Sequence, residues 1–319
     1  MELSDLAHWT PIRFDFSGRI PTIDWADLCA ERFVDPFFDQ TVARWAGGPQ
    51  ARPLVRTGLD ALLALDSEPA LDPAGMIYHV SRCGSTLVSR LLSTVPGVVV
   101  VAEPSPLNAL LGLDPARVDN VTLVRVVRLL VRALGRRRHG DEQQLVLKCT
   151  SWNIRRQEIL TAAFPDTPWV WVQRDPAEVV ASLLANPPGW LGHHVPPLQT
   201  ALRFGIDPVD VPTMPRAEFA ARALGAMLSS ASAGPARRLC IDHSELPAAV
   251  WQRVAPHFGI AIDAAALERI REQARFYSKE AEPQFFSADQ REACPVTDEM
   301  REAARRFADL RYRQLADSP

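Results

Sequence analysis

The chain has 319 residues, of which 47% are hydrophobic and 23% are charged, so it can bury a sizeable core as an ordinary globular protein. Its net charge of −3 argues against nucleic acid or an acidic membrane as a partner, and no apolar run reaches the roughly 18 residues that a membrane-spanning helix needs. The scattered cysteines show neither zinc-binding spacing nor a disulfide framework, which favours a cytoplasmic location: Cys29, Cys83, Cys149, Cys240 and Cys294.

The first 72 residues are rich in aromatic residues and proline. Helices are expected over residues 25–33 and 37–46, and Gly47-Gly48-Pro49 ends the second of them. An aromatic stripe of this kind is more often core than ligand pocket. We therefore interpret residues 1–72 as an N-terminal helical and aromatic cap that packs on the main body.

From residue 73 onward, short apolar runs alternate with helical patterns. These runs predict strands over 76–80, 98–102, 144–148, 169–173 and 238–242, and helices over 85–95, 121–134, 154–164, 177–185 and 217–230. Such alternation is typical of an α/β fold with a parallel central sheet and helices on both faces. Residues 73–319 are predicted to form this domain, with the Pro-, Gly- and His-rich stretch 186–215 as a loop or lid.

The turn after the first predicted strand carries the most informative motif, Arg82-Cys83-Gly84-Ser85-Thr86-Leu87. A helix that begins near Gly84 directs its free N–H groups and the positive end of its dipole at one point, where an anion binds. Arg82 adds a fixed positive charge, and Ser85 and Thr86 add hydroxyl donors. The G-x-x-x-x-G-K-[ST] pattern of ATP–magnesium sites is absent. The motif predicts a different oxyanion cradle, and a plain strand–helix turn with a surface arginine is the alternative.

A second motif begins with Arg174, directly after the predicted strand 169–173. The carboxyl ends of parallel strands are where α/β sheets bind ligands. Asp175-Pro176 fits a helix N-cap followed by the first helical position, so a helix starts here. Ser182 lies two turns into that helix and can face the same ligand as Arg174. A salt-bridging arginine at the end of a strand is the structural alternative.

Together the two motifs resemble those of the sulfotransferases. In that family [KR]-x-G-[ST]-[ST] holds the 5′-phosphosulfate of 3′-phosphoadenosine 5′-phosphosulfate (PAPS), and an Arg with a Ser eight residues later holds the 3′-phosphate. The resemblance spans about residues 76–258 and implies a P-loop nucleotide-kinase-like fold. The donor-binding residues that it implies are Arg82, Cys83, Gly84, Ser85, Thr86, Leu87, Arg174 and Ser182, with Lys279 in a late basic loop.

The position of the expected base points to one branch of this family. An arginine in the first motif and Glu103 at the end of strand 98–102 resemble the protein-tyrosine sulfotransferase type more than the cytosolic small-molecule type. There a glutamate is the base, and partial burial at a strand end is expected to raise its proton affinity. Lys148, which ends strand 144–148, resembles a lysine that stabilises the transferring group. A salt bridge from Arg82 or Lys148 to Glu103 is the structural alternative, and it is compatible with catalysis.

The sequence therefore predicts a PAPS-dependent sulfotransferase that uses no metal. Glu103 is the predicted base, Arg82 and Lys148 stabilise the transferring group, and the acceptor is a hydroxyl of a small molecule or a peptide. Two alternatives remain: a kinase or nucleotidase that uses ATP–magnesium with Glu103 or Asp242 as metal ligand, and a nucleotide-binding module without catalysis. No motif identifies the acceptor or the oligomeric state.

Overall fold

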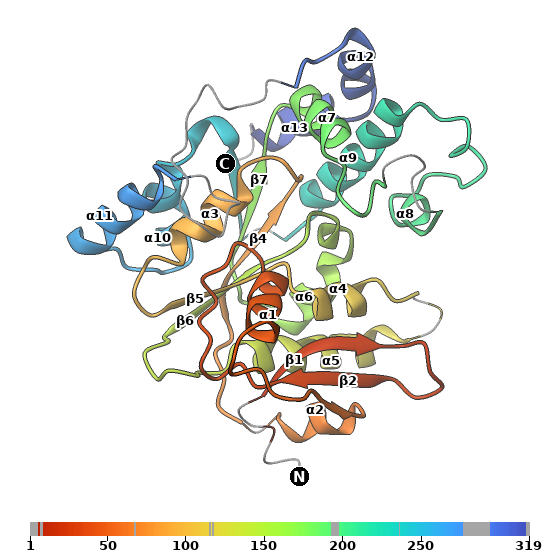
Figure 1. Ribbon diagram of the computed structural model, residues 1–319. Coiled ribbons are helices and arrows are strands. Elements are labelled where there is room, and N and C mark those ends of the chain that lie inside the picture. Colours follow the sequence, from red (N-terminus) through yellow and green to blue (C-terminus); the bar gives the residue numbers. More distant parts are fainter. Residues whose placement is uncertain are drawn as a thin grey trace.

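The computed structural model describes residues 6, 9–66, 68–114, 116, 118–192, 198–235, 237–276 and 294–316. Their strands form two sheets (Figure 1). The N-terminal sheet is antiparallel, in the order β1 (Thr10–Asp15), β2 (Thr22–Ala26), β3 (Val55–Thr57). The central sheet is parallel throughout, in the order β5 (Val98–Ala102), β6 (Gln144–Lys148), β4 (Pro73–His79), β7 (Trp169–Gln173), β8 (Arg238–Asp242).

The order of the central strands creates a topological switch point between β4 and β7. The chain leaves β4 toward β5 on one side, whereas it leaves the neighbouring β7 toward β8 on the other side. Beyond the carboxyl ends of two such strands the connections diverge, and open α/β sheets bind their ligands at this point. The residues that follow β4 and β7 therefore lie at this switch point.

Helices cover both faces of the central sheet (Figure 1). Crossovers between parallel strands are right-handed. The chain moves along the sheet in one direction from β4 to β5 and in the other direction in the later crossovers. Helix α3 (Ser85–Leu92) therefore lies on one face, and α5 (Asn120–Leu134), α6 (Gln157–Ala163) and α9 (Arg216–Ser232) lie on the other. The helices that build the main body are α3 (Ser85–Leu92), α4 (Ser105–Leu111), α5 (Asn120–Leu134), η2 (Ser151–Arg156), α6 (Gln157–Ala163), α7 (Pro176–Ala185), α8 (Leu198–Arg203) and α9 (Arg216–Ser232). After β8 come η3 (His243–Glu245), η4 (Val250–Val254), α10 (Ala255–His257), α11 (Ala264–Gln273), α12 (Asp298–Phe307) and α13 (Asp309–Ala316).

The predicted α/β fold class is confirmed, and most element bounds agree. Strands β5, β6, β7 and β8 have the predicted bounds, while β4 begins earlier, at Pro73. These runs are recognisable because a strand covered on both faces is apolar along its whole length. The predicted helix 154–164 is divided, since the short 3₁₀ helix η2 precedes α6.

The N-terminal region differs from the prediction, because it contains the sheet β1–β2–β3, which the sequence analysis did not expect. A helix over 25–33 is wrong: Trp25 lies in β2, where it pairs with Val55, and its Nε1 donates to Thr57 Oγ1 at 2.8 Å. The buried Asp24 beside it is held by Arg13 and Arg56. Pairing with a strand 30 residues away thus overrides local helix spacing, as is common for β-strands.

The N-terminal region also contains two helices, one of which was predicted. Helix α1 (Phe38–Ala46) matches the expected helix 37–46, and α2 (Asp60–Ala64) is a short additional one. Strand β1 contacts α4 and α5 of the main body, and α2 contacts α5. Elements β1 and α2 thus pack on the α/β domain, while the cap assignment of residues 1–72 and its boundary stay predictions.

Two further points concern the loop and the membrane. Helix α8 lies within the stretch 186–215, which was expected to be a loop, and residues 193–197 of that stretch lie outside the described part. Its role as a lid stays a prediction. In the part of the chain that the structure describes, no helix combines the length and apolar character needed to cross a membrane.

Candidate active site

The turn between β4 and α3 has a strained backbone. Gly84 has φ 88°, and a Cβ added there would lie 2.6 Å from Leu246 Cδ1. Ser81 and Arg82 also adopt positive φ values, 65° and 54°, which cost roughly 1–3 kcal/mol each for residues other than glycine. The first N–H groups of α3 have no acceptor within the helix. The turn therefore has the shape and the donors of an anion cradle.

Backbone strain also marks Glu103, which follows β5 with φ 52°. Among the described residues other than glycine, only Ser81, Arg82 and Glu103 have positive φ. Residues are held in such conformations where the surrounding structure enforces them, and they cluster at functional sites. Arg82 and Glu103 were predicted site residues, and Ser81 directly precedes the Arg82–Leu87 motif, so the backbone angles mark the same place as the motifs.

Glu103 and Lys148 form an ion pair, with Lys148 Nζ 2.5 Å from Glu103 Oε1. The strands β5 and β6 are neighbours and end together, and the Glu103 N–H donates to the Lys148 carbonyl at 2.7 Å. Lys148 is fully buried and also donates to Thr86 Oγ1 at 3.3 Å. The pairing of Glu103 with Lys148, one of the two alternatives named from the sequence, is thus present. In the described residues Arg82 forms no such pair.

The proton affinity of Glu103 differs from the expectation. Burial by itself raises the pKa of this carboxyl, but the charge of Lys148 and a hydrogen bond from His79 outweigh it and lower the pKa to about 2. The expected rise in proton affinity is therefore wrong for the ligand-free protein. The strand end predicts burial, which raises the pKa, and the salt bridge to Lys148, named from the sequence only as an alternative, has the larger effect.

His79, the last residue of β4, joins this pair and was missed from the sequence. Its side chain is buried, and its Nε2 lies 3.0 Å from the Cys149 carbonyl oxygen and 3.5 Å from Glu103 Oε1. The Ser81 N–H donates to its Nδ1 at 3.0 Å. The only signal in the sequence is a histidine near the end of the otherwise apolar predicted strand 76–80.

The two sequence motifs meet through Arg82. Its Nε donates to Ser182 Oγ at 3.0 Å, although the residues are separated by a hundred positions in the chain. Arg174 follows β7, and its Nη1 donates to the Arg82 carbonyl at 3.3 Å. Arg174 also forms an ion pair with Glu178 at 2.6 Å. Arg82, Arg174 and Ser182 therefore form one cluster beside the turn, at the switch point between β4 and β7.

Other predicted site residues play supporting parts in the turn. The Cys83 thiol is buried, donates to the Val172 carbonyl, and has its pKa raised to about 11 by burial, so it stays a thiol. Ser85 is buried at the start of α3, and Leu87 packs against the core. Lys279 lies outside the described residues.

The N-terminal cap reaches this site. Lys148 Nζ lies 4.9 Å from the centre of the Phe37 ring, just before α1. In the first turn of α1, Asp39 accepts a hydrogen bond from Ser105 Oγ, two residues after Glu103. Phe37 and Asp39 thus border the Glu103 side of the site, which the sequence alone did not indicate.

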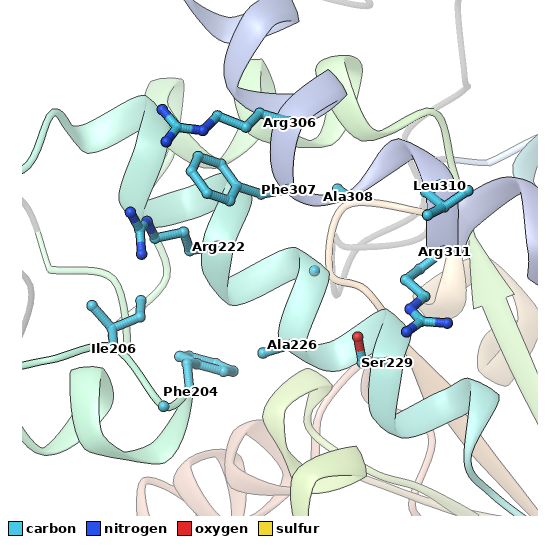
Figure 2. A pocket seen from close by; sticks show the side chains of 12 residues that line it. Phe204, Ile206, Arg222, Ala226, Ser229, Arg306, Phe307, Ala308, Leu310 and Arg311 are labelled. Atoms are coloured by element: carbon cyan, nitrogen blue, oxygen red, sulfur yellow. The ribbon is translucent and has the colours of Figure 1, made fainter.

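A separate cavity of about 280 Å³ lies between α9, α12 and α13 (Figure 2). Its lining includes Arg222 and Arg306, whose guanidinium groups lie 4.6 and 4.9 Å from the centre of the Phe307 ring. None of the residues singled out from the sequence lines this cavity. The candidate active site therefore remains the switch point at the carboxyl ends of β4 and β7, where the residues singled out from the sequence contact one another.

No family model and no curated protein matches the chain. Among solved structures, a sulfotransferase (STF1) from Mycobacterium tuberculosis aligns with 15% identity and a TM-score of 0.45, over 78% of this chain and 79% of that one. The sulfotransferase STF9 from Mycobacterium avium aligns with 14% identity and a TM-score of 0.44, over 67% and 70%. Mouse sulfotransferase SULT7A1 complexed with PAP aligns with 10% identity and a TM-score of 0.38, over 81% and 89%. A likeness at this level is too distant to transfer a function or site residues to this chain.

Proposed function

We propose that this protein is a PAPS-dependent sulfotransferase that transfers a sulfuryl group to a hydroxyl acceptor. The observation that carries the proposal is the contact between Arg82 and Ser182, because it joins the two motifs that the sequence analysis assigned to one nucleotide. The Glu103–Lys148 pair contacts the strained turn through the hydrogen bond from Lys148 to Thr86 Oγ1. The site thus brings an anion cradle, an arginine cluster and a carboxylate close to one another.

In this proposal the 5′-phosphosulfate binds the turn from Arg82 to Leu87. The N–H groups at the start of α3 and the Thr86 hydroxyl are the expected donors to its oxygens. The 3′-phosphate binds Arg174 and Ser182, and Arg82 lies between the two phosphate positions. Cys83 takes part through its backbone position in the turn and not through its thiol, because the thiol donates to the Val172 carbonyl.

The ion pair between Glu103 and Lys148 opens when the transfer takes place. In the ligand-free protein Lys148 neutralises Glu103, which makes Glu103 a weak base. The donor brings sulfuryl oxygens next to Thr86, and Lys148, already in contact with Thr86, is placed to turn toward them. Glu103 then loses part of its neutralising charge, and its pKa rises toward the ordinary value.

The chemical step needs a base and charge stabilisation but no covalent intermediate. The acceptor oxygen forms a bond to sulfur while the bridging S–O bond to the 5′-phosphate breaks, and Glu103 takes the acceptor's proton. Lys148 and Arg82 stabilise the charge that develops on the transferring group and on the leaving phosphate oxygen. Adenosine 3′,5′-bisphosphate (PAP) and the sulfated acceptor are the products.

The ATP–magnesium alternative is less well supported, because its two candidate metal ligands already have donors. Glu103 Oε1 is held by Lys148 and lies close to His79. Asp242 accepts hydrogen bonds from the Ser244 N–H and hydroxyl and from the Tyr312 hydroxyl. A metal would have to displace these partners. The non-catalytic alternative predicts PAP binding without turnover.

The 3′-phosphate site is tested by an Arg174→Ala variant. Titration calorimetry with PAP and with adenosine 5′-monophosphate separates the two phosphate positions. We expect PAP affinity to fall about 10- to 100-fold, the loss expected when hydrogen bonds to a charged group are removed. The affinity for the monophosphate is expected to change little. Arg125→Ala removes an exposed arginine on α5 and serves as the control. Full PAP affinity in Arg174→Ala contradicts the assignment.

Turnover tests the role of Glu103. Wild-type protein is incubated with PAPS and a panel of phenols, primary alcohols and tyrosine peptides, and sulfated products are detected by mass spectrometry. We expect Glu103→Gln to lose about 100-fold or more in turnover, the range of general base catalysis, while it still binds PAP. A Glu103→Gln variant with unchanged turnover rules out this residue as the base. A wild-type protein that binds PAP and sulfates nothing in the panel favours the non-catalytic alternative.

A further inference from the structure

We propose that His79 is a positioning residue: it holds the Glu103 carboxylate in place when Lys148 turns to the sulfuryl group, and it ties that carboxylate to the phosphate-binding turn. This inference rests on the proposed function, because it assigns Glu103 the role of base. His79 itself contacts neither donor nor acceptor in this proposal. It acts through Glu103 on one side of its ring and through Ser81 on the other.

The hydrogen bonds around the ring fix its tautomer. The Ser81 N–H donates to Nδ1 at 3.0 Å, so Nδ1 carries a lone pair and the proton of the neutral ring is on Nε2. Nε2 then donates to the Cys149 carbonyl at 3.0 Å, with Glu103 Oε1 at 3.5 Å on the same side. Burial lowers the pKa of His79, which keeps the ring neutral. The single N–H therefore donates first to the Cys149 carbonyl, with Glu103 Oε1 as a second and longer acceptor on the same side, and it adds no charge.

A neutral donor suits this position for a physical reason. Glu103 already faces Lys148, and a second permanent cation would keep its pKa low after Lys148 has turned away. The other ionisable groups near it are the Asp39 carboxylate, on the N-terminal cap, and the buried Cys149 thiol, neither of which carries positive charge. His79 fixes Oε1 and leaves the carboxylate basic enough to accept a proton from the acceptor.

The second bond links the base to the donor site. Ser81 opens the turn with a left-handed backbone, and its N–H is held by the His79 ring. The same ring therefore contacts both the turn that receives the phosphosulfate and the carboxylate that receives the proton. Few side chains offer an acceptor and a donor at this separation. Asn can replace only the acceptor at the Nδ1 position, and Gln can replace only the donor at the Nε2 position.

This difference allows the two bonds to be removed separately. In His79→Asn the amide oxygen takes the place of Nδ1, so the acceptor for Ser81 is kept and the donor to Glu103 is lost. In His79→Gln the amide nitrogen takes the place of Nε2, so the donor to Glu103 is kept and the acceptor for Ser81 is lost. His257→Gln is the control. Its Nε2 lies 3.2 Å from the carbonyl of Trp169, which begins β7 at the end of the strand away from the site.

PAP affinity by calorimetry and kcat with PAPS and the panel acceptors are measured for each variant. We expect His79→Asn to keep PAP affinity within about 2-fold and to lose about 10- to 100-fold in kcat, the worth of one hydrogen bond to a charged group. We expect the converse for His79→Gln: weaker PAP binding with kcat, at saturating PAPS, within about 3-fold of wild type. The control is expected to change neither quantity.

Three results would overturn the inference. His79→Asn with wild-type kcat shows that Glu103 does not depend on His79. Equal losses of kcat in both variants show that the ring only supports the fold. If Glu103→Gln itself keeps full turnover, the proposed base is wrong and the role of His79 fails with it. A normal loss in Glu103→Gln beside an unaffected His79→Asn instead refutes the His79 inference alone.

Discussion

Replacing Glu103 with Gln is expected to destabilise the protein, because it removes the negative charge beside a buried ammonium group. Lys148 is fully buried, and its Nζ contacts Glu103 Oε1 at 2.5 Å, Thr86 Oγ1 at 3.3 Å and the Phe37 ring at 4.9 Å. Of these neighbours only Glu103 carries a charge. The amide that replaces it can accept a hydrogen bond but cannot neutralise Lys148.

The size of the effect follows from the burial. Breaking a buried ion pair by removing one partner costs about 3–5 kcal/mol, and the 21% exposure of the Glu103 side chain places this case near about 3 kcal/mol. Replacing both residues, as in Glu103→Gln with Lys148→Met, removes the buried charge altogether. We therefore expect the double variant to be more stable than Glu103→Gln alone, with a coupling energy of about 2–3 kcal/mol.

Urea unfolding of the wild type, both single variants and the double variant at neutral pH measures this coupling. Glu302→Gln is the control, because its ion pair with Arg305 is exposed to solvent and is expected to contribute little to stability. A loss below about 1 kcal/mol in Glu103→Gln, or strictly additive single variants, would refute the reasoning that Lys148 depends on Glu103 for its charge.

Three further predictions follow from the same site. Gly84→Ala is expected to destabilise the fold by about 1–2 kcal/mol and to weaken PAP binding, since φ 88° is strained for alanine; unchanged PAP affinity in calorimetry would contradict this. The Cys83 thiol, buried and with its pKa raised to about 11, is expected to resist maleimide labelling of the native protein at neutral pH, and labelling at the rate of a free thiol would contradict its burial. The lowered pKa of Glu103 stabilises the native state above about pH 4.5, and this contribution is lost as the pH falls toward about 2. Glu103→Gln is therefore expected to flatten the dependence of the unfolding free energy on pH in that window. An unchanged pH dependence would contradict the pairing.

The central sheet was predictable from the sequence for a simple reason. A parallel strand covered on both faces is apolar along its length, so Val98–Ala102 and Trp169–Gln173 stand out from their surroundings. Motifs at strand ends were predictable as well, since the carboxyl ends of such strands share one edge. The meeting of Arg82 with Ser182 follows from these two rules and from the strand order.

What the sequence missed depends on contacts between distant segments. Strand β2 is held by pairing with residues 55–57, which local spacing at Trp25 does not reveal. The lowered pKa of Glu103 depends on Lys148, 45 residues away. The approach of Phe37 to Lys148 likewise requires the N-terminal cap to fold over the sheet edge. Local pattern predicts burial and strand ends, whereas these side-chain partners come from tertiary structure.

The most direct test of the central claim is a comparison of two nucleotides. Calorimetric titration of the wild type with PAP in the presence of a metal chelator, and with ATP plus magnesium, asks which phosphate pattern the site accepts. We predict saturable one-to-one binding of PAP without metal and markedly weaker binding of ATP with magnesium. Tight binding of ATP with magnesium together with no binding of PAP would contradict the assignment of the Arg82–Leu87 turn to a PAPS donor.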